Sequence, residues 1–299
     1  MKRDFLINET FNGTFPFKPH FKKINGFDMH YIDEGNGEPI VLLHGEPTWG
    51  YLYRKFIPPL SKKNRIIVPD HMGFGKSDVP HDKPYRLAQH IDNLSKLLTK
   101  LNLKNITLVV QNWGGPIGFG FAVSHHDLIK RIVIMNTSVG VAKEHRRLWF
   151  ESMIENGTYD QLMSNMKIFI PQMMFSIFVK KFSKDEKKII KKAYIAPFPS
   201  PEYCIGAKAF PLDIPKGKNH PSSEIMQKIR DELILLKNKP KILIWGMKDK
   251  IFPPKIIEIW QKIYPDIKIY KINEAGHYLQ EDAPEQIVQI IKEFINNTN

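Results

Sequence analysis

Residues 105–120 read NITLVVQNWGGPIGFG, and this stretch decides how the rest of the chain is interpreted. Ile106 to Val110 is a short apolar run rich in β-branched residues, which predicts a buried parallel strand. The chain then turns at 111–115 and continues as an apolar helix that we expect to end near Ser124. Small residues after the turn allow helix and strand to approach closely, and the first free N–H groups of the helix face whatever binds there. A strand, tight turn and helix of this kind raise one side chain, here Asn112, above the carboxyl ends of a parallel sheet.

The composition is that of an ordinary globular protein with an excess of positive charge. The 299 residues are 42% hydrophobic and carry a formal net charge of +13, and the one cysteine, Cys204, excludes an internal disulfide. We expect no signal peptide and no membrane span, and therefore a soluble cytoplasmic protein that is a monomer. The lysine-rich run 180–192 is typical of a solvated helix face, and no zinc-finger spacing, ribonucleoprotein motif or Walker loop accompanies it. We therefore expect no nucleic-acid or membrane partner, no metal and no cofactor.

Strands and helices alternate along most of the chain, which predicts a doubly wound α/β sheet. The expected strands are two pieces of a hairpin within 21–33 and runs at 39–43, 66–68, 106–110, 131–135, 241–245 and 267–272. The alternation stops between 142 and 222, where the sequence is helix-like and rich in Met and Phe. We predict a core domain of residues 1–141 and 223–299, with 142–222 as a helical cap inserted after the sixth strand. A cap over the carboxyl ends of the strands would leave an apolar slot between cap and sheet.

Two further polar residues follow predicted strands. Asp249 lies in GMKD after the strand 241–245, and His277 lies in AGH after the last strand. Their order along the chain, after the raised residue Asn112, matches the arrangement of the α/β-hydrolase fold. In that arrangement the acid holds the histidine in one tautomer and stabilises the positive charge that the histidine acquires. We therefore predict this fold, with a mostly parallel eight-stranded sheet, and a site made of Asn112, Asp249 and His277.

Five segments also carry a family resemblance. The motifs HGEPTW (44–49), MGFGKSD (72–78), ITLVVQNWGG (106–115), GMKD (246–249) and AGHYLQED (275–282) resemble haloalkane dehalogenases over nearly the full chain. In that family an aspartate stands where this chain has Asn112. The resemblance implies that a carboxylate attacks a halogen-bearing carbon, expels halide and leaves an alkyl ester, which water activated by the histidine then hydrolyses.

The resemblance also implies roles for other residues. The backbone N–H groups of Glu46 and Trp113 would form the oxyanion hole, and the Trp113 indole N–H would bind the halide. Trp149, early in the cap, is the expected second halide donor, and Trp49 is expected at the pocket mouth. The implied partners are a small halogenated or apolar substrate, a halide ion and water.

Asn112 conflicts with this chemistry because a neutral amide is a poor nucleophile. Three accounts of Asn112 stay open: it was changed from Asp on purpose to trap a complex, it is natural in a protein that binds without turnover or hydrolyses by another route, or it is slowly hydrolysed to Asp. Deamidation through a cyclic imide should be slow, because Trp113 rather than Gly follows. We favour a dehalogenase scaffold with little or no activity as written.

Three other functions stay open on the same scaffold. An epoxide hydrolase would need two cap tyrosines, for which Tyr159, Tyr194 and Tyr203 are candidates. A β-lactone decarboxylase is a second alternative, and a non-catalytic binder of small ligands is a third. A serine esterase is disfavoured, because position 112 is neither Ser nor Cys.

Overall fold

The centre of the molecule is an eight-stranded sheet, seen here in a computed structural model that describes residues 1–144, 147–148 and 150–298. The strand order is β1-β2-β4-β3-β5-β6-β7-β8. The strands are β1 (His20–Ile24), β2 (Phe27–Glu34), β3 (Pro39–Leu43), β4 (Arg65–Pro69), β5 (Ile106–Gln111), β6 (Ile129–Met135), β7 (Lys241–Gly246) and β8 (Lys268–Ile272). β2 pairs antiparallel with β1 and with β4, and every other neighbouring pair is parallel. The predicted mostly parallel sheet is confirmed.

Burial explains why the apolar runs became the central strands. Every residue of β3 and β5 is buried, as expected for parallel strands covered on both faces. The β1–β2 hairpin turns at Asn25 and Gly26, whose φ angles of 49° and 87° suit the primed hairpin turns that an Asn-Gly pair favours.

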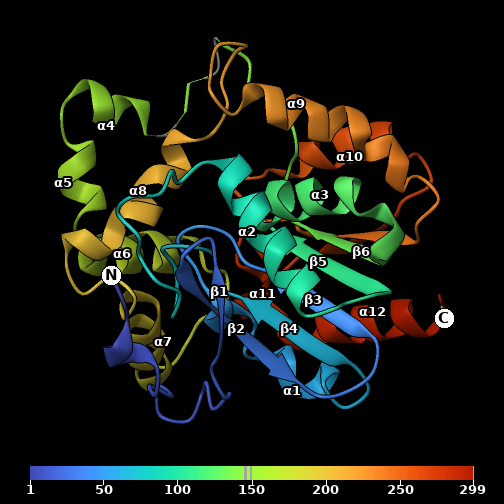
Figure 1. The fold of residues 1–299 in the computed structure, drawn as a ribbon, viewed down its shortest axis with the longest axis horizontal. Helices are drawn as coiled ribbons and strands as arrows, with labels where there is room; N and C mark the ends of the chain where they lie inside the picture. Colours follow the sequence, from blue (N-terminus) through green and yellow to red (C-terminus); the bar gives the residue numbers. More distant parts are fainter. Residues whose placement is uncertain (145–146, 149, 299) are drawn as a thin grey trace.

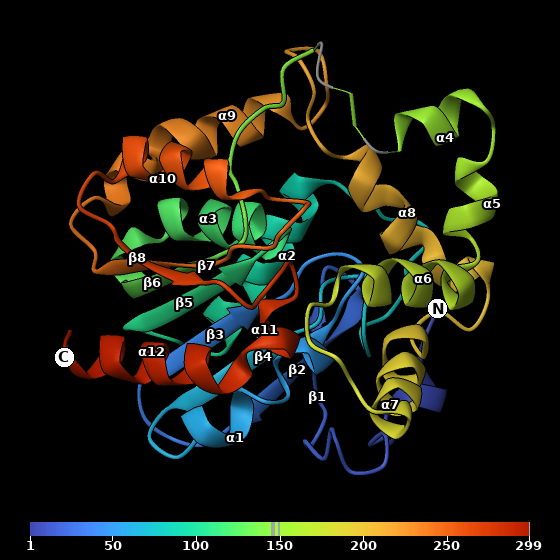
Figure 2. The same ribbon diagram turned by 180° about the vertical axis from the view of Figure 1, so that it is seen from behind.

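Helices cover both faces of the sheet (Figure 1 and Figure 2). One face carries α2 (Leu87–Lys100), α3 (Gly114–Ser124), α9 (Ser223–Glu232) and α10 (Ile257–Ile263), and the other carries α1 (Ile57–Leu60) and α12 (Pro284–Asn296). The short α11 (Leu279–Asp282) precedes α12. The 3-10 helices are η1 (Asp4–Leu6), η2 (Gly50–Tyr53), η3 (His126–Leu128), η4 (Pro201–Cys204), η5 (Leu233–Leu236) and η6 (Pro254–Ile256).

Among the described residues, five α-helices lie between β6 and α9 in the sequence. They are α4 (Glu151–Glu155), α5 (Tyr159–Met163), α6 (Met166–Ile177), α7 (Lys184–Ile195) and α8 (Ile205–Leu212), and they gather at one end of the sheet (Figure 2). A reciprocal capping box between Ser183 and Glu186 starts α7. The lysines of α7 are exposed while Ile190 and Tyr194 are buried, which matches the predicted solvated face.

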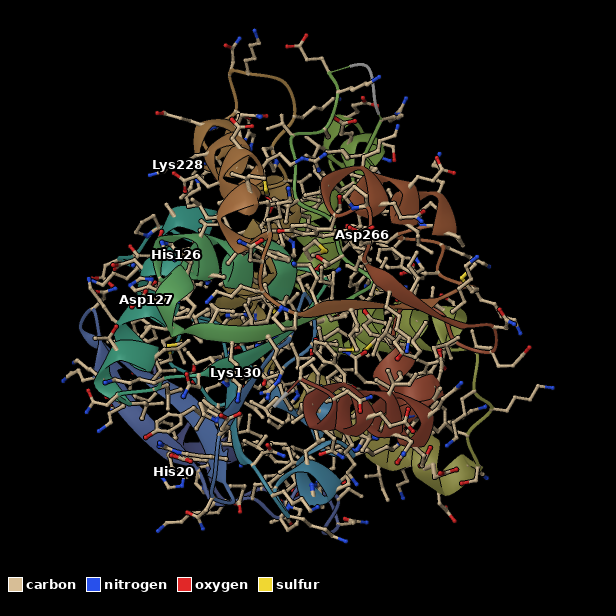
Figure 3. All side chains as sticks on the ribbon, turned by 90° about the vertical axis from the view of Figure 1, so that its right-hand side faces the viewer. His20, His126, Asp127, Lys130, Lys228 and Asp266 are labelled. Carbon is tan, nitrogen blue, oxygen red and sulfur yellow. The ribbon has the colours of Figure 1, made fainter. Side chains whose placement is uncertain are left out.

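The amino and carboxyl ends of the parallel strands lie on opposite sides of the molecule. Figure 3 views the molecule from the right-hand side of Figure 1 and labels His126, Asp127 and Lys130 around the start of β6 and Asp266 just before β8. These labelled residues stand at the amino ends of parallel strands. The carboxyl ends, where Asn112 follows β5, therefore lie on the side of α4–α8.

Among the described residues, no helix combines the length and apolar character needed to span a membrane.

Candidate active site

Asn112 occupies the turn between β5 and α3. Its φ of 50° lies in the left-handed region, which Asn tolerates better than most residues. The turn is closely packed: a Cβ on Gly45 would lie 2.2 Å from Asn112 Oδ1, and one on Gly114 would lie 2.3 Å from the carbonyl oxygen of Leu43. Glycine at 45 and 114 therefore lets strand β3 approach the turn and hold the Asn112 side chain above the sheet.

The structure brings the three predicted residues together around the Asn112 amide. Its Oδ1 accepts hydrogen bonds from the backbone N–H groups of Glu46 at 3.1 Å and Trp113 at 2.7 Å. Its Nδ2 lies 3.1 Å from Nε2 of His277, and Nδ1 of His277 lies 2.9 Å from Oδ2 of Asp249. Asn112 therefore lies between the expected oxyanion-hole donors and the histidine.

The contacts of His277 define its tautomer. Ionised Asp249 can only accept a hydrogen bond, so Nδ1 of His277 carries the proton and Nε2 has the lone pair. That lone pair faces Nδ2 of Asn112 and, at 3.3 Å, Nε2 of Gln111, which also donates to the carbonyl oxygen of His277 at 3.1 Å. The Asn112 amide thus engages the two backbone donors with its oxygen and the base with its nitrogen.

Asp249 is held ionised by its surroundings. Burial opposes its charge, but the interaction with His277 and the hydrogen bonds from His277 and Asn136 outweigh burial and lower its pKa. Asn136 donates to Oδ2 of Asp249 at 2.6 Å, and the backbone N–H groups of Ile251 and Phe252 donate to Oδ1. The sequence analysis missed Asn136. Its place directly after β6 was the available signal, since residues at the carboxyl ends of parallel strands gather at one edge.

Glu46 brings an unexpected acidic side chain to the same place. Although part of the residue reaches the surface, its Oε1 is inaccessible to water and has no hydrogen-bond partner among the described residues. Burial raises the pKa of this carboxyl group to about 8. At neutral pH the oxyanion-hole donors therefore stand next to an uncharged acid.

Trp113 is positioned to contact a ligand. It is 8% exposed, and its ring stacks on Phe210 of α8 with centroids 4.8 Å apart. Within the described residues, no acceptor pairs with its indole N–H, which remains available for an anion. Trp149, the expected second donor, lies outside the described residues.

The structure corrects the expectation for Trp49. Rather than lining a pocket mouth, it is fully buried, and its indole N–H donates to the carbonyl oxygen of Ala193 in α7 at 3.0 Å. Aromatic neighbours from the N-terminal segment surround it, which the local sequence could not indicate. Trp245 and Trp260 are also buried in the core.

The tyrosines considered for an epoxide hydrolase all have partners. The hydroxyl groups of Tyr159 and Tyr203 donate to the backbone carbonyls of Lys208 and Lys2, and that of Tyr194 donates to Glu281. None of the three directs an uncommitted O–H toward Asn112, so these candidates do not supply the pair of acids that epoxide opening needs.

The chain is similar to named proteins over most of its length. Residues 38–284 match the family described as alpha/beta hydrolase fold. The chain is 35% identical to a cis-3-alkyl-4-alkyloxetan-2-one decarboxylase of Shewanella oneidensis, over 95% of this chain and 90% of that protein. It is 33% identical to a haloalkane dehalogenase of Psychrobacter cryohalolentis, over 94% and 93%. Among solved structures, a putative ancestral haloalkane dehalogenase superposes with a TM-score of 0.81 at 25% identity, over 93% of this chain and 99% of that one.

Proposed function

The chain belongs to the haloalkane dehalogenase family of α/β-hydrolase-fold enzymes, and on that premise we propose that its site binds a small halogenated alkane but does not cleave it while residue 112 is Asn. The observation that carries the proposal is the double engagement of the Asn112 amide, by the backbone N–H groups of Glu46 and Trp113 and by His277.

An aspartate at position 112 would complete the reaction. One carboxylate oxygen would accept the N–H groups of Glu46 and Trp113, and the other would attack the halogen-bearing carbon. In the second step His277 would take a proton from water as the water attacks the ester. Asp249 would stabilise the imidazolium, and the same two N–H groups would stabilise the negative oxygen.

The amide removes the first step and leaves the second intact. Asn112 carries no negative charge with which to displace a halide, and its N–H₂ group lies 3.1 Å from Nε2 of His277. His277 cannot restore the nucleophile, because its part in this scheme is to activate water. We therefore expect substrate binding without formation of the alkyl ester.

The parts around the reacting group follow from the same proposal. The Trp113 indole N–H binds the departing halide, with Trp149 as the second donor. Residues 142–222 form the cap and 1–141 with 223–299 form the core, so that α8, through Phe210, covers Trp113. A monomeric state and a cytoplasmic location remain predictions.

A β-lactone decarboxylase is the second candidate. It is favoured by the 35% identity to the Shewanella enzyme and by 33% identity, over 90% of this chain, to a second protein of that name from Xanthomonas campestris. The corresponding substrate would be an oxetan-2-one with two alkyl chains, which loses carbon dioxide to leave an alkene.

One set of variants tests both candidates. We would measure bromide release from short bromoalkanes and alkene formation from cis-3,4-dialkyloxetan-2-ones, comparing the unchanged protein with Asn112→Asp. The matched control is Asn102→Asp, which adds the same charge at an exposed asparagine that also has a positive φ. Bromide release by Asn112→Asp, and not by freshly purified unchanged protein or Asn102→Asp, supports the dehalogenase, and alkene formation without bromide release replaces it with the decarboxylase.

A trapped intermediate would test the two-step scheme. In the double variant Asn112→Asp, His277→Gln, we expect the alkyl ester to accumulate, visible as a gain in protein mass equal to the alkyl group. If Asn112→Asp is inert toward both substrates while tryptophan fluorescence still responds to bromoalkane, the enzyme proposal is wrong and a non-catalytic binder takes its place.

A further inference from the structure

The side chain of Asn112 is itself bound as a hydrolase binds an acyl substrate. Its carbonyl oxygen accepts two backbone N–H groups, those of Glu46 and Trp113. Two such donors on one oxygen draw electron density from the attached carbon and stabilise the oxyanion that forms when the carbon is attacked. Its nitrogen, the group that would leave, lies 3.1 Å from Nε2 of His277.

The acid–base pair beside that amide, His277 and Asp249, is held in place by hydrogen bonds. Asp249 holds Nδ1 of His277 at 2.9 Å and is itself fixed by Asn136. His277 and Asp249 are each 3% exposed, so the pair acts in a site from which most water is excluded. A base is needed to activate water, and its conjugate acid is needed to protonate the departing nitrogen.

We propose that this site hydrolyses the side-chain amide of Asn112 and so produces its own aspartate nucleophile. His277 Nε2 takes a proton from a water molecule as the water oxygen bonds to Cγ of Asn112, and the oxyanion forms against Glu46 and Trp113. The Cγ–Nδ2 bond then breaks, the proton passes from His277 to the nitrogen, and ammonia leaves. The new carboxylic acid gives its proton to ammonia, so one amide and one water yield one carboxylate and one ammonium ion.

The inference rests on the proposed function, because it uses the water-activating half of that reaction. The amide nitrogen takes the place of the alkyl oxygen of the ester. An amide is a poorer substrate than an alkyl ester, so we expect slow maturation rather than turnover.

The common competing route, attack by the following backbone nitrogen to form a cyclic imide, is disfavoured here. The Trp113 N–H donates to Oδ1 of Asn112 at 2.7 Å. After loss of its proton, the nitrogen lone pair would point at that oxygen rather than at Cγ. Trp113 is also held in a helical conformation, with φ −62° and ψ −23°, at the start of α3.

The neighbouring Gln111 supplies a matched control within the same peptide. Its amide nitrogen lies 3.3 Å from Nε2 of His277, similar to that of Asn112, but its Oε1 is buried and accepts no hydrogen bond from the described residues. Without donors on its oxygen it lacks the oxyanion stabilisation. Hydrolysis should therefore occur at Asn112 and not at Gln111.

The test is a timed incubation in water labelled with heavy oxygen, followed by proteolysis and mass spectrometry. We expect the peptide that contains Asn112 to convert to normally linked aspartate with one heavy oxygen, while Gln111 stays an amide. Asn-Gly pairs elsewhere in the chain serve as reporters of the imide route, which also yields isoaspartate. These pairs begin at Asn12, Asn25, Asn36 and Asn156.

Two variants separate catalysis from spontaneous chemistry. His277→Gln and Asp249→Asn should each slow conversion at Asn112 by about a hundredfold, the lower end of general acid–base contributions, and leave the Asn-Gly rates unchanged. Thermal unfolding of each variant checks its fold, and either variant alone suffices if the other is unfolded. Unchanged conversion in a folded variant, isoaspartate at 112, equal conversion of Gln111, or an intact Asn112 after the Asn-Gly pairs have converted would each overturn the inference.

The outcome is separable from that of the proposed function. If Asn112→Asp releases bromide but the unchanged protein never converts, self-hydrolysis is wrong and the proposed function stands. If the protein converts but Asn112→Asp is inert toward bromoalkane and lactone, self-hydrolysis stands and the proposed function is wrong.

Discussion

Replacement of Glu281 by Gln should cost the protein a large part of its stability. Glu281 is fully buried in α11, and Arg54 donates to both of its carboxylate oxygens. Lys55 lies 3.1 Å away, and the hydroxyl of Tyr194 in α7 donates at 2.8 Å. Burial opposes ionisation of Glu281, but the charge and hydrogen bonds of Arg54 outweigh it and lower its pKa to about 2. This network joins Tyr194 of α7 to α11 and to the residues that follow η2.

The expected magnitude follows from that pKa. A fall from the usual 4.5 to about 2, at about 1.4 kcal/mol per pKa unit, makes the charged form of Glu281 worth roughly 3 kcal/mol to the folded state. Because the folded pKa is the lower one, this stability is present above pH 4.5 and is lost as the pH falls toward 2. In Glu281→Gln the buried Arg54 charge is left without its counter-ion, which typically costs about 3–5 kcal/mol.

Urea unfolding at neutral pH and at steps down to acid pH measures both effects. We expect Glu281→Gln to be less stable by about 3 kcal/mol or more at pH 7 and to lose less stability in acid than the unchanged protein. The control is Glu285→Gln, an exposed glutamate four residues away. Equal stability of the two variants, or an unchanged acid dependence in Glu281→Gln, would refute the reasoning.

Three further predictions concern the site. In the Asn112→Asp background, Asn136→Ala should lower kcat by about tenfold to a hundredfold with little change in KM, because Asp249 loses a charge-assisted hydrogen bond worth about 1.5–3 kcal/mol; an unchanged pH–rate profile would contradict this positioning role. The unchanged protein should lose a few kcal/mol of stability as the pH rises from 4.5 to about 8, because folding raises the pKa of Glu46 and makes its ionisation costly. Glu46→Gln should not show this loss, and urea unfolding at pH 5 and pH 8 compares the two proteins. Trp113→Phe should weaken the affinity for bromide, measured calorimetrically, at least about tenfold, since the indole N–H is the proposed donor, and an unaltered titration would exclude that donor.

The sequence predicted the sheet because its signal is local. A parallel strand covered on both faces must be a continuous apolar run, and residues 39–43 and 241–245 therefore marked β3 and β7 to within one residue. The positions of Asp249 and His277 followed from the same periodicity, since each lies in the loop that follows a strand.

The residues that escaped prediction depend on contacts between distant segments. A single Asn after β6 has no periodic signature, so the sequence could not predict the hydrogen bond from Asn136 to Asp249, which depends on how the strands pair. The buried Trp49 depends on α7 folding over it from 144 residues away. The protonation of Glu46 likewise depends on how completely its neighbours exclude water.

Arg3 links the segment α4–α8 to the rest of the molecule along one side only. Its buried guanidinium donates to the carbonyl oxygens of Ser77 and Gly73 on the core side and of Pro197 and Tyr203 on the other. Together with the bonds of Trp49 to α7 and of Tyr194 to Glu281, these bonds fix the α7 side of the segment to α11 and to the loops that follow β3 and β4. We therefore expect the motion that admits a ligand to displace α4 and α5 more than α7 and α8.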